Sequence, residues 1–538
     1  MKHTCASVEA LVKDKILLIL GAGVMQIPAI KAARRMGLKV CCADGNSDAP
    51  GRGLADVFGH IDLKDLHGLT DFAAANKAEG VFTAGTDFST SVAWIAEKLG
   101  LPGIPYKTAL HAKDKLLMRK RLAEAGIPVP RFYSSSDDSA VKEEFWSAGL
   151  LFPVVVKPAD SMGARGVRTA SAITELQHAV QEARSFSFSK RVIVEEYITG
   201  PEFSIDALIY ENNVYECGFA DRHIYFPPHF IELGHTIPTN LSADKRKEVF
   251  SVFAQAVTAL GIHTGAAKGD VFLTENGPMI GEIAARLSGG FMSGWSFPIA
   301  SGVDLTSAAI RIALGFPPGD IQQKKQHFCA ERAWISVPGT VQEVYNIPEP
   351  EPDSSVKEVF TRISKGDKLV FPRNNVEKCG NLLVERESYE AASTEAERLV
   401  GEIVLRLSPG CLDTARFLLS DKHETGPSAF IPGPQFLASI KKLDNLYENE
   451  NKKGITIWPL DDFSDIEHQW FGPSFIKGLD IVKKYCGAEF SKNGRYVIAG
   501  VFWKAYVTGG IQGGLWAVDT VQWLLENQKH PREYFQQW

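Results

Sequence analysis

Alternating apolar and helical segments near the N-terminus constrain the fold of this 538-residue chain more than any other feature. From Ile16 to about Pro105, the apolar stretches KILLIL, LKVCCAD and GVFTAG alternate with the helical stretches IPAIKAARRMG, LTDFAAANKA and SVAWIAEKLG. Alternation at this pitch is typical of a parallel sheet that is covered by helices. The sequence therefore predicts an α/β domain over residues 1–108.

The first strand of this domain leads into a glycine turn, ILLILGAGVMQIPAI, that is similar to a dinucleotide-binding fingerprint. Gly21 and Gly23 make the turn, and Asp44 follows a second strand at about twenty residues, where a ribose-binding acid is expected. The third fingerprint glycine is replaced by Gln26, whose side chain would hinder close packing of helix and strand. We expect a Rossmann-like domain that binds no NAD or NADP and whose turn faces a carboxylate or amino-acid substrate.

Length and composition indicate a globular chain of several domains, because 538 residues exceed the size at which one hydrophobic core stops growing. The net charge of −6, without a dense basic block, argues against nucleic acid as a partner. Residues 1–14 lack the apolar core of a secretory signal, and the apolar run 16–20 is too short to cross a membrane. We expect a cytoplasmic protein without a membrane partner.

The cysteines predict neither a zinc site nor a disulfide framework. There are eight of them, and they are scattered along the chain without a C-x-x-C pair. We expect buried or incidental thiols at Cys5, Cys41, Cys42, Cys217, Cys329, Cys379, Cys411 and Cys486.

A lysine and a glycine loop form the first segment that suggests chemistry, VVVKPADSMGARGV. Lys157 ends an apolar strand, and the turn that follows contains Ser161, Gly163, Arg165 and Gly166. Backbone N–H groups of such a loop can cover phosphate oxygens, while a fixed lysine supplies a compact positive charge. Taken alone, a surface hairpin with an incidental lysine explains the segment equally well.

Acidic residues at strand ends form the next two segments. In VIVEEYITGPEFS, Glu195, Glu196 and Glu202 could accept hydrogen bonds from a nucleoside, although solvated strand-end acids are the simpler alternative. In GDVFLTENGPMIGEIAARLSGG, Asp270 and Glu282 lie on two strands that the Asn276-Gly277 turn would pair. Paired carboxylates suit magnesium together with nucleotide phosphates. Arg286 could clamp a carboxylate or the charge that develops on it.

In their order along the chain, these segments resemble the ATP-grasp superfamily of carboxylate-amine ligases. The resemblance covers about residues 15–407 and includes AKDKLLMRKRLAEAGIPVPRF, ahead of the three segments above. The EIAAR form is similar to the branch that includes L-amino-acid ligases. The resemblance implies an α/β and α+β multidomain fold: the pre-ATP-grasp domain, an ATP-grasp domain at 109–330 with a lid at about 130–200, and a small C-terminal subdomain at 331–408.

The resemblance also implies a role for each site residue. Phosphates would be bound by Lys115, Lys157 and the loop of Ser161, Gly163, Arg165 and Gly166; adenosine would be bound by Glu195, the adjacent Glu196, the backbone of Ile198, and Glu202. Lys268 would contact the γ-phosphate, and Arg286 would orient the carboxylate or acyl phosphate. Asp270 and Glu282 would hold magnesium, for which manganese could substitute. Many members have Asn where this chain has Ala284, so the number of bound metal ions, one or two, stays open.

The implied reaction joins a small-molecule carboxylate, expected to be an amino acid, to an amine with release of ADP and phosphate. Glu232 and His235 in HFIELGHTIPTNL are candidates for the substrate side, with a structural histidine as the alternative for His235. Two further functions stay open: a purine-pathway or carboxylase-type enzyme that uses formate or bicarbonate, and an assembly protein with a vestigial nucleotide site. A homodimer is one alternative for the oligomeric state.

Residues 409–538 lie beyond the resemblance and are expected to form an additional domain. Six of the ten tryptophans occur there, a density typical of a compact core or a contact surface. The segment YVTGGIQGGLWAVDTVQWLLENQ predicts a glycine loop that leads into an amphipathic helix with Trp516, Val521, Leu524 and Leu525 on its buried face.

Overall fold

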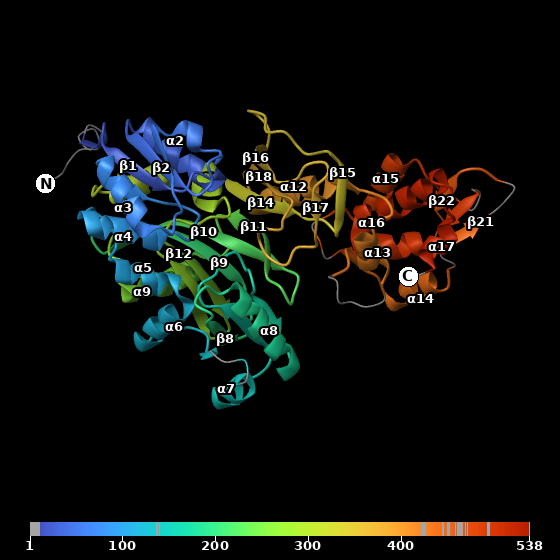
Figure 1. Ribbon diagram of the computed structural model, residues 1–538, viewed down its shortest axis with the longest axis horizontal. Coiled ribbons are helices and arrows are strands. Elements are labelled where there is room, and N and C mark those ends of the chain that lie inside the picture. The colour runs from blue at the N-terminus through green and yellow to red at the C-terminus, as the bar shows by residue number, and fades with distance from the viewer. Residues whose placement is uncertain are drawn as a thin grey trace. The chain divides into compact units, whose positions relative to one another are not determined.

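The computed structural model describes residues 11–135, 138, 140–420, 427–443, 446–448, 452–457, 459, 466–468, 470, 472–491, 495–536 and 538. The chain forms two compact units (Figure 1): unit 1 consists of residues 1–331 and 385–392, and unit 2 of residues 332–384 and 393–538. A search of the described residues finds no helix with the length and apolar character that a membrane crossing needs. The seven cysteines in the described part are all free, and Cys5 lies outside it.

Unit 1 begins with the predicted parallel sheet, which is confirmed. Its strands are β1 (Ile16–Leu20), β2 (Lys39–Asp44), β3 (Val57–His60) and β4 (Gly80–Phe82), in the order β3-β2-β1-β4, and all pairs are parallel. Helices α2 (Ile27–Arg35), α3 (Leu66–Ala75) and α4 (Ser89–Leu99) connect them. The sequence reading missed β3 because this four-residue edge strand buries only Gly59 and lacks an apolar run.

The glycine turn after β1 is filled by the chain's own side chains. Ala22 N donates a hydrogen bond to Asp44 Oδ2 at 2.7 Å, and Gly23 N donates to Gln26 Oε1 at 3.1 Å. Gln26 is buried, and its Nε2 donates to the Ala84 carbonyl at 2.5 Å. The acid and the amide therefore bind the backbone of the turn itself, which agrees with an expected lack of dinucleotide binding.

A capping acid divides the next helical segment. Two helices lie in this stretch, α5 (Tyr106–Lys113) and α6 (Lys115–Glu124). Asp114 lies between them, and its Oδ1 accepts hydrogen bonds from Leu116 N and Leu117 N, both at 3.0 Å. Such a cap satisfies orphan N–H groups at a helix start. It places Lys115 at the first position of α6.

The described residues of 132–196, within the range expected for the lid, form a small α/β region. Its four-stranded antiparallel sheet has the order β5-β8-β6-β7. Helices α7 and α8 pack against one another beside it (Figure 1). The elements are β5 (Phe132–Ser135), α7 (Val141–Ser147), β6 (Val154–Pro158), β7 (Arg168–Ala170), α8 (Ile173–Phe186) and β8 (Val192–Glu196).

An antiparallel sheet forms the body of unit 1, with strands in the order β13-β12-β9-β10-β11-β14. Helix α9 (Ala243–Leu260) covers it, and Phe253 and Val257 of this helix share a core with Ile205, Val271 and Ile283 of the sheet. The strands are β9 (Glu202–Tyr210), β10 (Asn213–Tyr225), β11 (Ile231–Ile237), β12 (Gly265–Thr274), β13 (Gly277–Ala284) and β14 (Phe328–Trp334), and α10 (Phe297–Ser301) and α11 (Leu305–Ala313) follow β13.

Unit 2 continues with short antiparallel strand pairs around one helix. Strand β15 (Gly339–Tyr345) pairs with β17 (Lys368–Leu369) and β19 (Val404–Leu407), and β16 (Val356–Thr361) pairs with β18 (Gly380–Arg386). Helix α12 (Tyr389–Glu402) ends before β19. Residues 404–407 of that strand pair with β15.

The tail of unit 2 is built around α16 (Gly500–Glu526), and here the prediction of a glycine loop is wrong. The glycines lie inside the helix, which is interrupted at Gly510 with φ 58° and ψ −141°. Trp503 and Trp516 are fully buried, whereas Trp458 lies outside the described residues. The other elements are α13 (Leu412–Leu419), β20 (Phe430–Ile431), α14 (Pro434–Lys441), β21 (Leu446–Glu448), β22 (Ile455–Ile457), β23 (Glu467–His468), α15 (Phe475–Cys486), β24 (Glu489–Phe490), β25 (Tyr496–Ile498) and α17 (Pro531–Phe535).

Hydrogen bonds of Arg406 and Gln512 are among those that connect this tail to the earlier part of unit 2. Arg406 donates from Nε and Nη2 to the two carboxylate oxygens of Asp519, both at 2.7 Å. Gln512 accepts from Val337 N at 2.9 Å and donates to the Ile335 carbonyl at 3.0 Å. Residues 409–538 therefore pack with residues 332–408 inside unit 2.

Candidate active site

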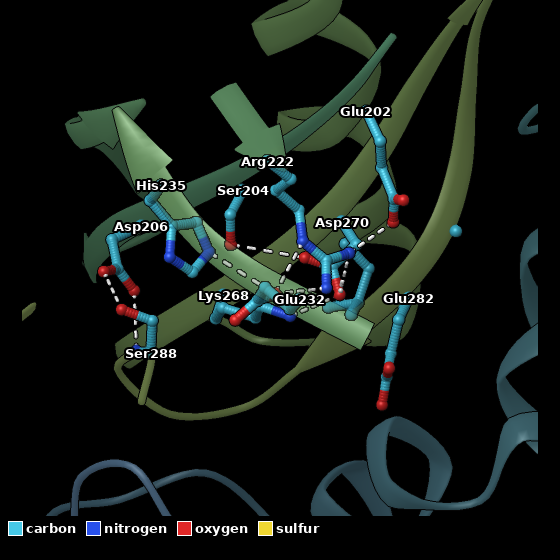
Figure 2. A network of polar contacts seen from close by, with 12 residues as sticks. Glu202, Ser204, Asp206, Arg222, Glu232, His235, Lys268, Asp270, Glu282 and Ser288 are labelled. Carbon is cyan, nitrogen blue, oxygen red and sulfur yellow. Dashed lines mark hydrogen bonds and ion pairs between the residues drawn. The ribbon is translucent and has the colours of Figure 1, made fainter. Parts of the chain in front are cut away.

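Two carboxylates face each other on the β12–β13 hairpin. Asp270 and Glu282 are register partners, beside a bulge between Asp270 and Val271. The hairpin closes with Thr274 opposite Gly277, so that Glu275 and Asn276 form its loop. Asp270 is buried, whereas the Glu282 side chain is 37% exposed. The predicted pairing of these strands is confirmed, and it brings both acids to one place (Figure 2).

Lysines neutralise this pair of acids. Lys268 donates a hydrogen bond from Nζ to Asp270, and Lys115 Nζ lies 3.6 Å from Glu282 Oε1. Partial desolvation raises the pKa of Glu282, but nearby cations, with Lys115 contributing most, lower that pKa to about 2. Ala284 is the register partner of Lys268 across the hairpin. Both carboxylates therefore have lysines as counterions.

Arg222 on β10 is a central residue that the sequence reading missed. Its guanidinium donates to Glu202, contacts Asp270 Oδ2 at 3.2 Å, and donates from Nη2 to Glu232 Oε2 at 2.5 Å (Figure 2). Burial lowers the pKa of Arg222, but the charges of these acids raise it well above its ordinary value. Burial also raises the pKa of Glu202, against the charge of Arg222. One guanidinium thus connects three predicted site acids.

The lid contributes Lys157 through an ion pair with Glu195. Lys157 Nζ donates to Glu195 Oε2 at 2.6 Å, and Arg119 Nε of α6 donates to Glu195 Oε1, also at 2.6 Å. Burial would raise the pKa of Glu195, but Arg119 and Lys157 hold it at about 2. Arg119 also donates to the Gly281 carbonyl at 2.5 Å, next to Glu282. Arg119, which the sequence reading missed, therefore connects the lid strand β8 to the metal-candidate strand β13.

Both oxygens of Glu195 are occupied in this arrangement. For this carboxylate to accept a hydrogen bond from the adenine amino group, as the resemblance implies, one of the two cations would have to release it. The adjacent Glu196 accepts from Arg131 N at 2.9 Å and Arg131 Nε at 2.8 Å, which holds β8 to the chain before β5. Ile198 follows β8 and is half-buried. Its backbone N–H and carbonyl lie in the segment between β8 and β9.

The glycine loop of the lid lies beside Lys115. Lys115 Nζ donates to the Ser161 carbonyl at 2.7 Å, which fixes the start of the loop to α6. Gly163 and Gly166 have φ values of 68° and 69°, a region that favours glycine. Arg165 donates from Nε to the Met162 carbonyl at 3.0 Å. The predicted phosphate loop therefore has the tight backbone that such a loop needs, and it adjoins two predicted phosphate-binding lysines.

Arg286 follows β13 in a segment that contacts the N-terminal sheet. Its Nη1 donates to the Leu287 carbonyl at 3.0 Å, and Gly85 N donates to the same oxygen at 3.3 Å. Asp87, two residues beyond Gly85, was not singled out in the sequence. Burial raises its pKa, and the charges of Arg286 and Lys115 oppose that effect. The loop after β4 thus lies near Arg286.

The two substrate-side candidates, Glu232 and His235, form a buried chain with Glu331, which the sequence did not indicate. His235 Nδ1 lies 2.8 Å from Glu331 Oε2, and its Nε2 lies 3.5 Å from Glu232 Oε2. Burial lowers the pKa of His235, but the charges of Glu232 and Glu331 raise it to about 9. His235 is therefore an imidazolium at neutral pH. Glu331 could not be found from sequence, because it lies 96 residues from His235.

The donor chemistry of the hairpin fits a hard divalent cation. Asp270 and Glu282 supply carboxylate oxygens from adjacent strands, and magnesium is typically held by one or two carboxylates together with nucleotide phosphates. Clusters of three or more His, Cys, Asp or Glu that could hold a metal ion are absent from the described part of the chain. The pair is thus suited to a metal ion that arrives with its nucleotide.

Two families match the chain. The ATP-grasp domain matches residues 150–294, and the L-amino acid ligase C-terminal domain 2 matches residues 333–408. The first match includes the lid loop, the hairpin and Arg286. Among solved structures, an L-amino acid ligase from Bacillus licheniformis superposes with a TM-score of 0.65 at 24% identity, covering 74% of this chain and 99% of that one.

Curated relatives match over part of their length. Carnosine synthase 1 of Gallus gallus is 26% identical over 336 residues, 57% of this chain and 36% of the relative. A D-alanine–D-alanine ligase of Gloeobacter violaceus is 32% identical over 188 residues, 33% of this chain and 61% of the relative. The chain thus spans less than two thirds of either relative. The similarity is thus to the ATP-grasp domain over residues 150–294 and to the L-amino acid ligase C-terminal domain 2 over residues 333–408.

Proposed function

We propose that the chain is an ADP-forming ligase that joins the carboxylate of an amino acid to an amine through an acyl phosphate. One observation carries this proposal: at the β12–β13 hairpin, Lys268 and, from α6, Lys115 contact the Asp270–Glu282 pair. Opposed carboxylates with lysine counterions match the charge pattern of a magnesium–nucleotide complex. The L-amino acid ligase domain at residues 333–408 supports an amino acid as the substrate.

We propose that the nucleotide binds between the lid and the β12–β13 hairpin. Lys115, Lys157 and the loop of Ser161, Gly163, Arg165 and Gly166 would bind the phosphates. Adenosine would be bound by the segment of Glu195, Glu196 and Ile198 and by Glu202. The contacts of Lys115 with Ser161 and of Lys157 with Glu195 support this assignment, because they hold both ammonium groups beside the loop.

The chemistry would proceed in two steps. A carboxylate oxygen of the substrate attacks the γ-phosphorus of ATP, and ADP leaves as the acyl phosphate forms. The amine then attacks the acyl carbon, loses a proton and expels phosphate to give the amide. Lys268 would neutralise charge on the transferred phosphoryl group, and Arg286 would orient the carboxylate and the acyl phosphate. Positioning and charge neutralisation supply most of the rate in such transfers.

Magnesium would be held by Asp270 and Glu282, where it would neutralise phosphate charge when bound. Ala284 supplies no ligand, which leaves one or two metal ions to be decided by titration. The lid would exclude water, because hydrolysis of the acyl phosphate would waste the activated carboxylate. Release of free phosphate without amide would thus indicate that the lid does not fully exclude water from the acyl phosphate.

A phosphate-release screen tests the proposal. Purified protein is supplied with ATP, magnesium and pairs drawn from a panel of amino acids and amines, and ADP, AMP and the amide are quantified by chromatography. We expect one ADP and one phosphate for each amide formed. Stoichiometric AMP and pyrophosphate, or the absence of ATP consumption across the panel, would refute the ligase proposal. Turnover that needs bicarbonate or formate in place of an amino acid would instead favour a carboxylase-type or purine-pathway enzyme.

A further inference from the structure

A buried acid behind the hairpin is not used by the reaction as proposed. Asp206 lies on β9, where it is the register partner of Lys268 on β12, and it is fully buried. Burial raises the pKa of Asp206 to about 6, against the hydrogen bonds of Ser288 and the charges of Arg286 and Lys268. Asp206 is therefore ionised at neutral pH, although its burial destabilises the charged form. A buried charge of this kind needs strong hydrogen-bond partners.

Both partners of Asp206 come from one residue, Ser288. The backbone N–H of Ser288 donates to Asp206 Oδ1 at 2.8 Å, and its hydroxyl donates to Oδ2 at 2.5 Å (Figure 2). Ser288 is itself buried, and its carbonyl accepts from the Ser293 hydroxyl at 2.7 Å. Hydrogen bonds to an ionised acceptor are stronger than neutral ones. The carboxylate therefore fixes the backbone at this point of the loop.

The fixed point lies directly after the carbonyl that Arg286 binds. Arg286 Nη1 donates to the Leu287 carbonyl at 3.0 Å, and the next residue is Ser288. The following glycines pass close to other walls of the site: a Cβ at Gly290 would lie 3.2 Å from His235 Cε1, and one at Gly289 would lie 3.3 Å from Gly85 Cα. A shift of Ser288 would thus move the hydrogen-bond acceptor of Arg286.

We propose that Asp206 is the positioning residue for Arg286, which it holds through Ser288 and the Leu287 carbonyl. The inference rests on the proposed ligase reaction, in which Arg286 orients the carboxylate and the acyl phosphate. Asp206 does not touch the substrate in this role. Asp206 acts on catalysis by fixing the backbone of residues 287–288. A substitution of Asp206 should therefore change the rate only in a protein that retains Arg286.

A double-mutant cycle tests this dependence. Asp206→Asn should lower kcat on the order of 10²-fold, the loss typical of a reacting group misplaced by about 1 Å, and should leave the KM for ATP unchanged. In an Arg286→Ala background, the same substitution should change kcat by less than about twofold, because residues that act through one group are non-additive. Equal losses in both backgrounds would overturn the proposal.

The ratio of phosphate to amide gives a second readout that simple destabilisation would not move. An acyl phosphate that Arg286 no longer orients is hydrolysed, so Asp206→Asn should release more phosphate per amide than the wild type. Asp221→Asn is the matched control, since Asp221 on β10 also holds a loop by one hydroxyl and one backbone N–H, those of Thr239 and Asn240. The control should keep the wild-type ratio. A ratio unchanged in Asp206→Asn, or raised equally in the control, would contradict the proposal.

Two further arms keep the test decisive. If Asp206→Asn fails to fold, Ser288→Ala removes the hydroxyl donor alone and should raise the ratio in the same direction. If the wild type consumes no ATP, the ligase proposal fails, and the positioning role is then decided by the Nε–Hε NMR signal of Arg286. Broadening or displacement of that signal in Ser288→Ala supports the role, and an unchanged signal refutes it.

Discussion

Glu195 accepts hydrogen bonds from Arg119 on one oxygen and from Lys157 on the other, each at 2.6 Å. Arg119 comes from α6, Lys157 from β6 and Glu195 from β8, so the trio ties the lid to the body of unit 1. Because the Glu195 and Arg119 side chains are only 2% and 1% exposed, loss of either partner leaves a buried charge.

Arg119→Met should therefore destabilise unit 1 by about 3–5 kcal/mol, the typical cost of breaking a buried ion pair from one side. Denaturant unfolding measures the change, and calorimetric titration should show weaker ATP binding because Glu195, the partner of Lys157, is no longer held by Arg119. Arg121→Met on the same helix is the control, since Arg121 is exposed and donates to the Ala259 carbonyl. Equal stabilities of the two variants would contradict a special role for Arg119.

Glu282→Ala should abolish ATP turnover, because it removes the exposed member of the carboxylate pair. Nucleotide binding by the variant should also lose its dependence on magnesium, which titration with and without a chelator measures. Glu275→Ala changes an exposed acid in the loop of the same hairpin and should leave turnover at the wild-type level. Wild-type activity in Glu282→Ala would remove Glu282 from the metal site.

The His235 imidazolium should make stability depend on alkaline pH. Its pKa is raised from 6.5 to about 9 in the fold, so its charge stabilises the folded state fully below pH 6.5 and progressively less up to pH 9. The free energy of unfolding should fall over that range by up to about 3 kcal/mol. His235→Asn should flatten the fall, whereas His178→Asn, at an exposed position on α8, should preserve it. A steep fall in both variants would assign the effect to another group.

The Arg406–Asp519 pair should contribute to the stability of unit 2. Asp519 is buried and accepts from both Nε and Nη2 of Arg406, so Asp519→Ala should cost about 2 kcal/mol once solvent screening of the partly exposed arginine is considered. Asp413→Ala, which breaks the exposed pair with Arg416, should cost less than about 0.5 kcal/mol. Thermal unfolding of both variants measures the difference, and equal shifts would refute it.

Titration with NAD or NADP should show no specific binding to the N-terminal domain. Asp44 and Gln26 already bind the backbone N–H groups of Ala22 and Gly23, which a dinucleotide site would leave for its ligand. Fluorescence of the reduced cofactors provides the measurement, with a known dehydrogenase as positive control. Saturable binding at micromolar concentration would show that these side chains move aside.

Local sequence patterns predicted the parts of the site that lie on one element or one hairpin. The pairing of Asp270 with Glu282 follows from two strands and a tight turn, and Lys157 with its glycine loop follows from one strand end. Arg119 and Asp206 were missed because their partners Glu195 and Ser288 lie 76 and 82 residues away. An arginine in a helix or an acid in a strand has no local pattern that separates a buried ion pair from a solvated side chain.

The tail illustrates the opposite error, in which a local rule was applied too strongly. Glycine has a low helix propensity, which favoured a loop over the segment around Gly509 and Gly510. Close packing reverses this preference, since a Cβ at Gly509 would lie 2.4 Å from Leu418 Cδ2 and one at Gly513 would lie 1.9 Å from the Ala505 carbonyl oxygen. These glycines are needed for the close approach of neighbouring chain segments, and only Gly510 interrupts the helix.

The lysine counterions of the hairpin have a consequence for how a ligand enters. Lys268 and Lys115 occupy the carboxylates that a metal ion would take, so an arriving magnesium–nucleotide complex would displace both ammonium groups toward its phosphates. Entry is then an ion exchange, in which carboxylates pass from lysine to metal and lysines pass from carboxylate to phosphate. The ammonium groups that would neutralise the phosphates are therefore already at the hairpin before the proposed ligand binds.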